Sequence, residues 1–482
     1  MKKYRTLGFF LFSFLFVVLF SRATSFLYVF EGADPSIFKQ MGLAILKGKT
    51  PYIDYFDNKG CLLYFIHALG FWLGGDFFIL LMQALSLTIT LVIWDTTLAL
   101  YKNQHQRNIG LGIALFMLAC FYGAGDQTQE WCLPFISFPL LVFVRANKNH
   151  LEPGPWQMVL IGLCFGVITF IQINNACAFL GFVAYLWIQY LLKKDFRSLF
   201  RSIGCFMVGW LLIALPCILY FYVKAGSYGI SEMVYSSFLS NLEYIGIQLH
   251  TKWFHWLPYL MFVLSLVLIQ IINCGKEKNL WIPFLISMTF FLGTFGKRFN
   301  AFYLIAILPL VVISMLHFNL KGHKKIKIGL LSTALGCVLF MGSNVAFHIV
   351  NDLILQNEKE VKNYELFHHC VEIIPENEKD SIFNYNLFWH GYGMMQHEGL
   401  LQCNRVSLAF DLPTLMKEEQ AKPVMKPLWI LISYNKRYYA EDDEFIQANY
   451  DLCCEFRYDR LYLRKPLIGN EFQVCLYRRK SN

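Results

Sequence analysis

Side chains that could carry chemistry are concentrated in one short stretch near the N-terminus, residues 31–60. The stretch gathers five charged residues that could take part in chemistry, in a chain that has few charges elsewhere in its first half: Glu31, Asp34, Asp54, Asp57 and Lys59. A carboxylate can act as a general base toward an acceptor hydroxyl, and two carboxylates can hold a divalent cation through oxygen ligands. The alternative is that Asp34 only caps a helix and that the other charges are solvated loop residues.

The local pattern around these residues predicts a short helix followed by a loop. Asp34 directly precedes Pro35, which favours a helix start, and Gly48 is a natural helix end. Apolar residues such as Ile37 and Met41 follow at helical spacing on one face. The helix is too short to cross a bilayer, so we expect it to lie along the membrane surface.

Two further charged groups lie later in the chain. Asp126 and Glu130 fall in a loop between apolar runs, and Lys297 and Arg298 stand at the head of another apolar run. Arg offers a fork of donors and Lys a compact charge, so this basic pair suits a phosphate on which negative charge develops as it departs. A lipid headgroup contact or a salt bridge to a carboxylate is the alternative. Together, a base and phosphate-binding cations suit glycosyl transfer from a lipid phosphate.

The composition excludes an ordinary soluble protein. Of 482 residues, 56% are hydrophobic and only 16% are charged. Eleven long apolar runs, from Leu7–Tyr28 to Ile328–Ile349, predict a polytopic α-helical membrane protein. The formal net charge of +9 is better explained by basic loops on one side of a membrane than by nucleic-acid binding.

The distribution of Lys and Arg predicts the orientation of the spans. Basic residues recur in alternate loops, including residues 2–5, 102–107, 193–201 and 321–327. By the positive-inside rule these loops and the N-terminus are cytoplasmic, and the acidic stretch is on the outer side. Counting the apolar segment Gly60–Gly74 as a span would reverse every later loop. We therefore interpret it as a second surface-lying or re-entrant helix.

The composition changes after residue 350. Apolar runs shorten to strand length and alternate with charged segments. We expect residues 1–350 to form the transmembrane catalytic domain and residues 351–482 to form a soluble α/β domain on the periplasmic side. In an oxidising compartment, one or two disulfides could form among the five cysteines of this domain.

The motif D-P-S-x-F, followed by G-x-x-P-Y-x-D-x-F-D-x-K-G, resembles the first outer loop of bacterial GT-C glycosyltransferases. The resemblance is to the family 39-like group that contains protein mannosyltransferases and aminoarabinose transferases. Further similarity lies in Glu130 with Pro134, and in G-K-R-F followed by Tyr303. It extends over essentially the whole chain, because the C-terminal soluble domain also matches the architecture of this group.

The resemblance implies a polyprenyl-phosphate sugar donor, transfer on the periplasmic side and, usually, inversion at the sugar. By position, Asp34 matches the first-loop acidic residue, which would be the base or a metal-associated group. Lys59 would face the donor phosphate, as would Lys297 and Arg298, and Tyr303 follows the basic pair. Asp54 and Asp57 match the second half of the loop.

The sequence therefore predicts a bacterial inner-membrane glycosyltransferase whose acceptor is an envelope lipid, glycan or protein. Membrane lipids are the other expected partners, and a divalent metal ion is the only cofactor considered. A transporter or flippase for lipid-linked saccharides would need ionisable residues near the bilayer midplane and repeated halves. Asp95 lies near the cytoplasmic end of its span and no internal repeat is found, which argues against transport. A non-catalytic scaffold is the third option, because Cys61 and Phe302 replace the Pro and His common in the family.

Overall fold

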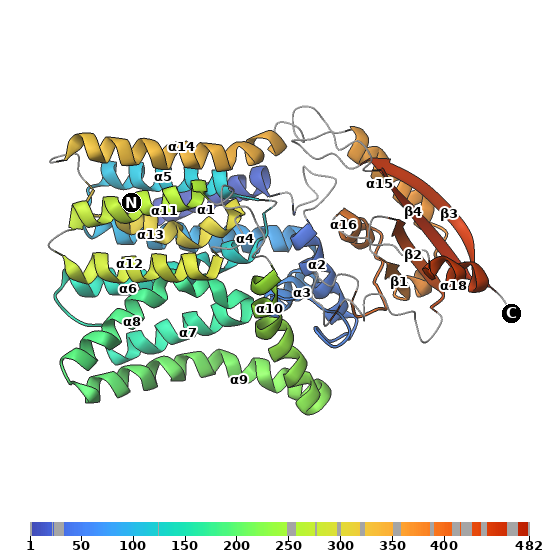
Figure 1. The fold of residues 1–482 in the computed structure, drawn as a ribbon, viewed down its shortest axis with the longest axis horizontal. Coiled ribbons are helices and arrows are strands. Elements are labelled where there is room, and N and C mark those ends of the chain that lie inside the picture. Colours follow the sequence, from blue (N-terminus) through green and yellow to red (C-terminus); the bar gives the residue numbers. More distant parts are fainter. Residues whose placement is uncertain are drawn as a thin grey trace.

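The structure is a computed structural model, and it describes residues 2–21, 23, 33–123, 125–247, 257–274, 277–295, 300–318, 323–349, 358–385, 390–406, 415, 427–434, 441–459 and 471–480. A bundle of long helices makes up one part of the molecule, and a sheet region lies at one end of it (Figure 1). We call this end the sheet end of the bundle. Two short helices, α2 and α3, lie between the bundle and the sheet (Figure 1).

The bundle is built from helices whose bounds are α1 Lys2–Phe20, α4 Asp76–Ala99, α5 Gln104–Phe121, α6 Thr128–Lys148, α7 Pro155–Gln172, α8 Cys177–Leu192, α9 Phe196–Val234, α11 Leu257–Cys274, α12 Lys278–Phe295, α13 Leu308–Ser314 and α14 Lys324–Ile349. Among the described residues, four helical stretches are long and apolar enough to cross a membrane: Asp76–Ala99, Pro155–Leu192, Phe196–Glu243 and Lys324–Gly342. A helical membrane protein is thus confirmed, whereas the number of about eleven spans stays a prediction.

Helix α4 shows how the apolar pattern produces the bundle. Its fully buried side chains recur every three or four residues and form one stripe: Leu80, Ala84, Leu87, Leu91, Trp94 and Leu98. This spacing places them on one side of the helix. Helix α4 packs against α1, α5 and α6, so the stripe joins the common core of the bundle.

Helix α2 spans Ala33–Leu46 and ends as its sequence predicts. Gly48 takes a φ of +84°, and the N–H of Lys49 donates to the carbonyl of Ala44 at 2.9 Å. The pattern also predicts a two-faced helix that lies along the membrane surface, but in the structure its polar residues Lys39 and Gln40 are buried. Lys39 is fully buried with its ammonium 2.9 Å from Asp76, because the start of α4 and the sheet region cover that face.

The C-terminal region, residues 358–480, contains a four-stranded sheet in the order β1-β2-β4-β3. The strands are β1 Ile382–Tyr385, β2 Trp429–Tyr434, β3 Tyr450–Asp459 and β4 Glu471–Arg479, and the helices are α15 Glu358–Val371, α16 His390–His397 and α18 Glu441–Asn449. Strand β1 pairs in parallel with β2, and β4 is antiparallel to both of its neighbours. The domain boundary at residue 350 stays a prediction.

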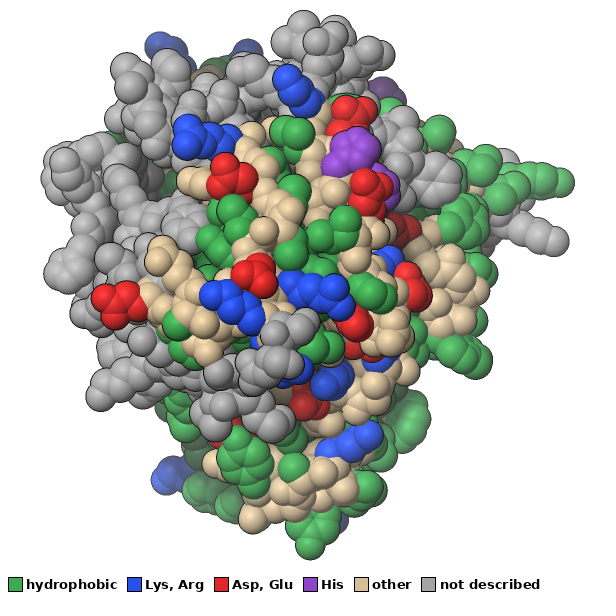
Figure 2. All heavy atoms as spheres, turned by 90° about the vertical axis from the view of Figure 1, so that its right-hand side faces the viewer, with side chains coloured by type: hydrophobic (Ala, Val, Ile, Leu, Met, Phe, Trp, Pro, Cys, Tyr) green, Lys and Arg blue, Asp and Glu red, His purple; other side chains and the backbone are tan. Residues whose placement is uncertain are grey.

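Alternation along the strands gives the sheet two apolar faces. Leu431 and Leu476 belong to one buried cluster, and Ile430 and Ile432 belong to another, as the period of two requires. Figure 2 shows Lys, Arg, Asp and Glu side chains interspersed on the face that this region presents. The five cysteines of the region, for which disulfides were considered, are free thiols in the structure: Cys370, Cys403, Cys453, Cys454 and Cys475.

The loop between α2 and α3 (Cys61–Leu73) is fixed where it ends, at Gly60. The N–H of Gly60 donates to the carbonyl of Ile171 at 2.8 Å. A Cβ on Gly60 would lie 2.2 Å from the carbonyl carbon and oxygen of Phe170. Only glycine allows this approach, because the opposing atoms belong to the backbone and cannot rotate away.

Replacing this glycine should therefore destabilise the protein. Gly60→Ala should lower the free energy of unfolding by about 1–3 kcal/mol, the usual cost of overpacking. The matched control is Gly112→Ala on α5, where an added methyl group meets no described atom within 4 Å and helix propensity should slightly raise stability. Thermal unfolding of both purified variants in detergent measures the difference, and equal melting temperatures would contradict the tight contact.

Candidate functional site

A buried carboxylate organises the loop between α2 and α3. Asp57 is only 1% exposed. One of its oxygens accepts a hydrogen bond from the Tyr64 hydroxyl at 2.7 Å, and the other accepts from the N–H of Asn58 at 2.7 Å. Because an unpaired buried charge is very costly, these bonds determine how the loop can fold. We call Asp34, Asp57, Lys59 and Tyr64 the first-loop cluster.

Opposing charges act on this carboxylate. Burial raises the pKa of Asp57, and nearby Asp34 raises it further, whereas Lys59 and the two hydrogen bonds oppose the increase. Asp34 lies in the first turn of α2 and is half-buried. No described residue donates a hydrogen bond to its carboxylate. Asp34 is therefore the more exposed carboxylate of this pair.

Lys59 is held mainly through its backbone. The Tyr52 hydroxyl donates to the Lys59 carbonyl at 2.6 Å, and Tyr64 also donates to this carbonyl at 3.2 Å. The Lys59 ammonium donates to the side-chain oxygen of Asn58 at 2.6 Å, and the side chain is half-buried. An ammonium group carries three N–H donors, and among the described residues Asn58 accepts a hydrogen bond from one of them.

Neighbouring helices brace the same loop. The Ser237 hydroxyl, in the π-helical turn Tyr235–Leu239, donates to the Tyr52 hydroxyl at 3.0 Å. Asn241, in α10 (Ser240–Ile247), donates to the Asn58 carbonyl at 2.8 Å. Asp54 accepts from the N–H of Thr50 at 2.6 Å and thereby closes a turn within the loop.

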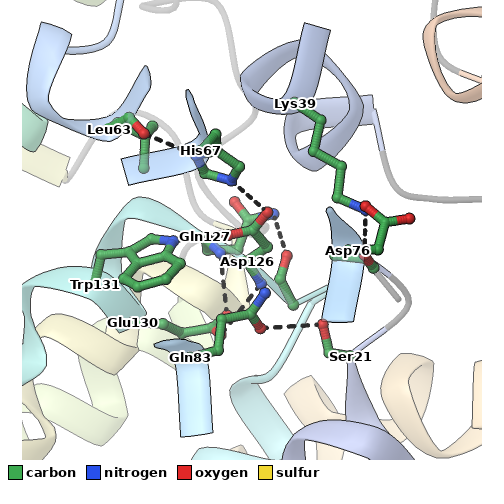
Figure 3. A network of polar contacts seen from close by, with 12 residues as sticks. Ser21, Lys39, Leu63, His67, Asp76, Gln83, Asp126, Gln127, Glu130 and Trp131 are labelled. Atoms are coloured by element: carbon green, nitrogen blue, oxygen red, sulfur yellow. Dashed lines mark hydrogen bonds and ion pairs between the residues drawn. The ribbon is translucent and has the colours of Figure 1, made fainter. Parts of the chain in front are cut away.

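A second group of buried polar residues surrounds the loop before α6 and comes from this loop, α3 and the start of α6 (Figure 3). His67 Nε2 lies 2.8 Å from one oxygen of Asp126, and Trp131 Nε1 donates to the other oxygen at 2.7 Å. His67 Nδ1 lies 2.7 Å from the Leu63 carbonyl. Both ring nitrogens thus face acceptors, and a carbonyl only accepts, so a proton must also lie between His67 and Asp126. We call these residues and Glu130 the second-loop cluster.

Glu130 stands in the first turn of α6, ahead of its apolar part. Its carboxylate accepts from the N–H groups of Asp126 and Gln127 at 3.2 and 3.3 Å. Burial raises the pKa of Glu130 to about 8, and a hydrogen bond from Tyr122 opposes this increase. A cavity of about 20 Å³ beside Glu130 is also lined by Gln83 and Tyr122, which is room for about one water molecule.

Helix α3 connects the two clusters. Tyr64 and His67, three residues apart on this helix, are both fully buried. Tyr64 binds the carboxylate of one loop and His67 the carboxylate of the other. Neither residue was predicted as a site residue from the sequence. The available signal was their polar side chains at helical spacing within the apolar segment Gly60–Gly74.

The structure brings some of the predicted site residues together and separates others. Asp34, Asp57 and Lys59 share the first-loop cluster, and Glu130 belongs to the second. Tyr303 lies in the 3₁₀ helix Ala301–Ile307, which packs against α5 and α6. Asp54 lies in the same loop as Asp57, and three other predicted residues lie outside the described residues: Glu31, Lys297 and Arg298. Their contacts stay predictions.

The part of the chain that the structure describes shows no assembled metal site. Among the described residues, no group of three or more His, Cys, Asp or Glu side chains is placed to hold a metal ion. Near Asp34, the Asp57 carboxylate already accepts a hydrogen bond at each of its oxygens. The divalent ion considered for Asp34 remains a prediction.

Comparisons with known proteins agree with this architecture. The family model described as "Putative competence-induced protein Ccs4 N-terminal domain" matches residues 1–364. The crystal structure of ArnT from Cupriavidus metallidurans bound to undecaprenyl phosphate is similar to this chain, with a TM-score of 0.57 and 12% sequence identity. The alignment covers 98% of this chain and 97% of that chain. No curated protein sequence matches. The likeness to ArnT confirms that the fold is GT-C-like.

The raised pKa of Glu130 predicts a pH dependence of stability. An acid with a higher pKa in the folded than in the unfolded chain makes stability fall as pH rises between the two values, here from about 4.5 to about 8. In the wild-type protein the free energy of unfolding should therefore decrease from pH 5 to pH 8. Glu130→Gln should make this decrease smaller by about 2 kcal/mol or more. Thermal unfolding in detergent at both pH values measures the effect.

Glu152→Gln is the matched control for this prediction. Glu152 is a surface carboxylate that pairs with Lys193 at 3.1 Å, so its removal should leave the pH dependence of stability almost unchanged. A Glu130→Gln profile that parallels the wild-type profile would contradict a buried, proton-binding Glu130.

Proposed function

The chain belongs to the family of putative competence-induced Ccs4 N-terminal domains and shares the fold of ArnT, and from this we propose that it is a membrane glycosyltransferase. The proposed donor is a sugar linked to polyprenyl phosphate, and the proposed acceptor is an envelope lipid, glycan or protein. The ArnT structure contains undecaprenyl phosphate, which supports a lipid phosphate as the donor carrier. The proposed site of transfer is the outer face of the bacterial plasma membrane.

The first-loop cluster is the observation that carries this proposal. It combines a half-buried carboxylate, Asp34, with an ammonium group, Lys59, around the buried Asp57. A base and a phosphate-binding cation are the two groups that this transfer needs. Both charges act on Asp57, since Lys59 lowers the pKa of its buried carboxyl and Asp34 raises it.

In the proposed reaction, the acceptor hydroxyl oxygen attacks the anomeric carbon of the donor sugar. Asp34 accepts the hydroxyl proton, which is general-base catalysis. The bond between the anomeric carbon and the phosphate oxygen breaks, and polyprenyl phosphate leaves with the electron pair. Lys59 stabilises the charge that develops on this phosphate. Lys297 and Arg298 are proposed as additional phosphate-binding groups from the sequence resemblance.

A specific contact argues against the transporter alternative. Asp95, in the last part of α4, accepts a hydrogen bond from Arg5 at 2.7 Å and lies 3.0 Å from Nε of Arg107. These ion pairs connect α4 to α1 and α5. Asp95 is thus accounted for by helix packing and needs no role in moving a substrate.

The proposed role of Asp34 predicts a large loss of turnover without loss of fold. The protein would be reconstituted in vesicles with a lipid extract that contains polyprenyl-phosphate sugars, and released polyprenyl phosphate would be measured by mass spectrometry. Asp34→Asn should lower the release rate by about 10²–10⁴-fold, the usual contribution of a general base. Asp380→Asn, the same change at a surface residue paired with Lys47, should leave the rate unchanged.

The outcome also separates the competing functions. Full activity of Asp34→Asn would refute Asp34 as the base. A wild-type protein that moves the lipid-linked sugar across the vesicle membrane but releases no polyprenyl phosphate would be a transporter. A wild-type protein that does neither would be a scaffold.

A further inference from the structure

One segment of the C-terminal region, residues 400–406, lies against the loop that carries Asp57 and Lys59. The N–H of Phe56 donates to the carbonyl of Arg405 at 2.8 Å. The Tyr55 hydroxyl donates to the carbonyl of Gln402. These contacts join residues about 350 positions apart in the sequence, and they are made by the backbone of the C-terminal segment.

The same segment also contacts α2. Gln40 donates from its side-chain amide to the carbonyl of Leu400 at 3.0 Å, and α16 packs against α2. Helix α2 carries Asp34 in its first turn. The C-terminal region thus touches both elements that supply the first-loop cluster.

Arg405 adds the central side-chain contact. Its Nε donates to the carbonyl of Tyr52 at 2.8 Å, and its terminal nitrogen pairs with Glu232 in the last part of α9. The guanidinium is less than one-fifth exposed, as is the carboxylate. The planar fork of arginine can serve two acceptors at once, which a lysine ammonium at the same place does less well.

Tyr52 is a residue whose backbone needs such support. Its φ is +68°, in the left-handed region that residues with a Cβ avoid. The side chain is completely buried, and the Tyr52 hydroxyl donates to the Lys59 carbonyl at 2.6 Å. A change in the position of Tyr52 therefore reaches Lys59 through a single hydrogen bond.

We propose that Arg405 is a positioning residue that holds Tyr52 in its left-handed conformation and thereby places Lys59 to bind the donor phosphate. Through this contact, the C-terminal region controls donor binding without touching the donor. The claim that Lys59 binds the donor phosphate rests on the proposed function. The claim that Arg405 positions Tyr52 rests on the hydrogen bonds alone.

The experiment compares three variants of the full-length protein in detergent. Arg405→Ala removes the side-chain contacts with Tyr52 and Glu232. Arg405→Lys keeps a charge for Glu232 but cannot reproduce the fork. Lys47→Ala is the matched control, because it removes another ion pair between the bundle side and the C-terminal region, 2.6 Å from Lys47 to Asp380, and leaves the first loop untouched.

Two quantities are measured on each protein. Hydrogen–deuterium exchange of peptides covering residues 49–60 reports the loop, and native mass spectrometry with added undecaprenyl phosphate reports lipid-phosphate affinity. In Arg405→Ala the loop should exchange at least about tenfold faster and the Kd should rise at least about tenfold. Arg405→Lys should keep the wild-type melting temperature yet show the same faster exchange. Lys47→Ala should match wild type in both measurements.

The two parts of the proposal fail separately. Wild-type exchange of the loop in both Arg405 variants would overturn the positioning role. Faster exchange with an unchanged Kd would overturn the link from Tyr52 to Lys59. If the wild-type protein does not bind undecaprenyl phosphate, the proposed function fails, and the exchange rates still decide whether Arg405 positions the loop. A melting temperature of Arg405→Lys as low as that of Arg405→Ala would reduce Arg405 to a general stabiliser of the fold and overturn the proposal.

Discussion

The hydrogen bond between the buried Asp57 carboxylate and the Tyr64 hydroxyl is the contact on which the first-loop cluster depends. A carboxylate that is 1% exposed is tolerated only when its oxygens are hydrogen-bonded. Tyr64 can reach Asp57 only if α3 begins immediately after Gly60. At Gly60 the chain packs directly against the backbone of Phe170. One buried charge thus fixes the loop, the start of α3 and the contact with the end of α7.

The same helix extends this constraint to a second loop. His67, one turn beyond Tyr64, is hydrogen-bonded to the buried Asp126 carboxylate. The N–H of Asp126 in turn donates to the Glu130 carboxylate at the start of α6. The two loops are therefore not independent attachments to the bundle. Helix α3 holds both from one side, and the C-terminal region holds the first loop from the other through Arg405 and Phe56. Rigid support on both sides is what a site must have if it is to keep a base and a cation at a fixed separation.

Local sequence patterns predicted the local parts of this arrangement. The glycine at position 48 ends α2 as expected, and long apolar runs correspond to the helices of the bundle. The resemblance to GT-C enzymes predicted the fold that the likeness to ArnT confirms, at an identity of only 12%. These features depend on residues within a few positions of one another or on a pattern spread over the whole chain. Local patterns and whole-chain patterns can both be recognised from the sequence alone.

The contacts that complete the candidate site could not be read in this way. Tyr55 and Gln402 are separated by 347 positions, and Arg405 and Tyr52 by 353. Nothing in the segment around Arg405 distinguishes it from an ordinary surface arginine until the fold brings it to Tyr52. The burial of the polar face of α2 was missed for the same reason, since Gln40 is covered by a segment 360 positions away. Tyr64 and His67 were visible only as polar interruptions of an apolar run.

The most direct test of the account is to locate the phosphate of the donor carrier on the protein. A polyprenyl phosphate with a photoreactive group beside its phosphate would be incorporated into vesicles with the wild-type protein, irradiated, and the labelled peptides identified by mass spectrometry. The account predicts labelling of the peptide that contains Lys59, and competition by unmodified undecaprenyl phosphate. Labelling confined to the lipid-facing sides of the long helices, with none in residues 49–60, would contradict it.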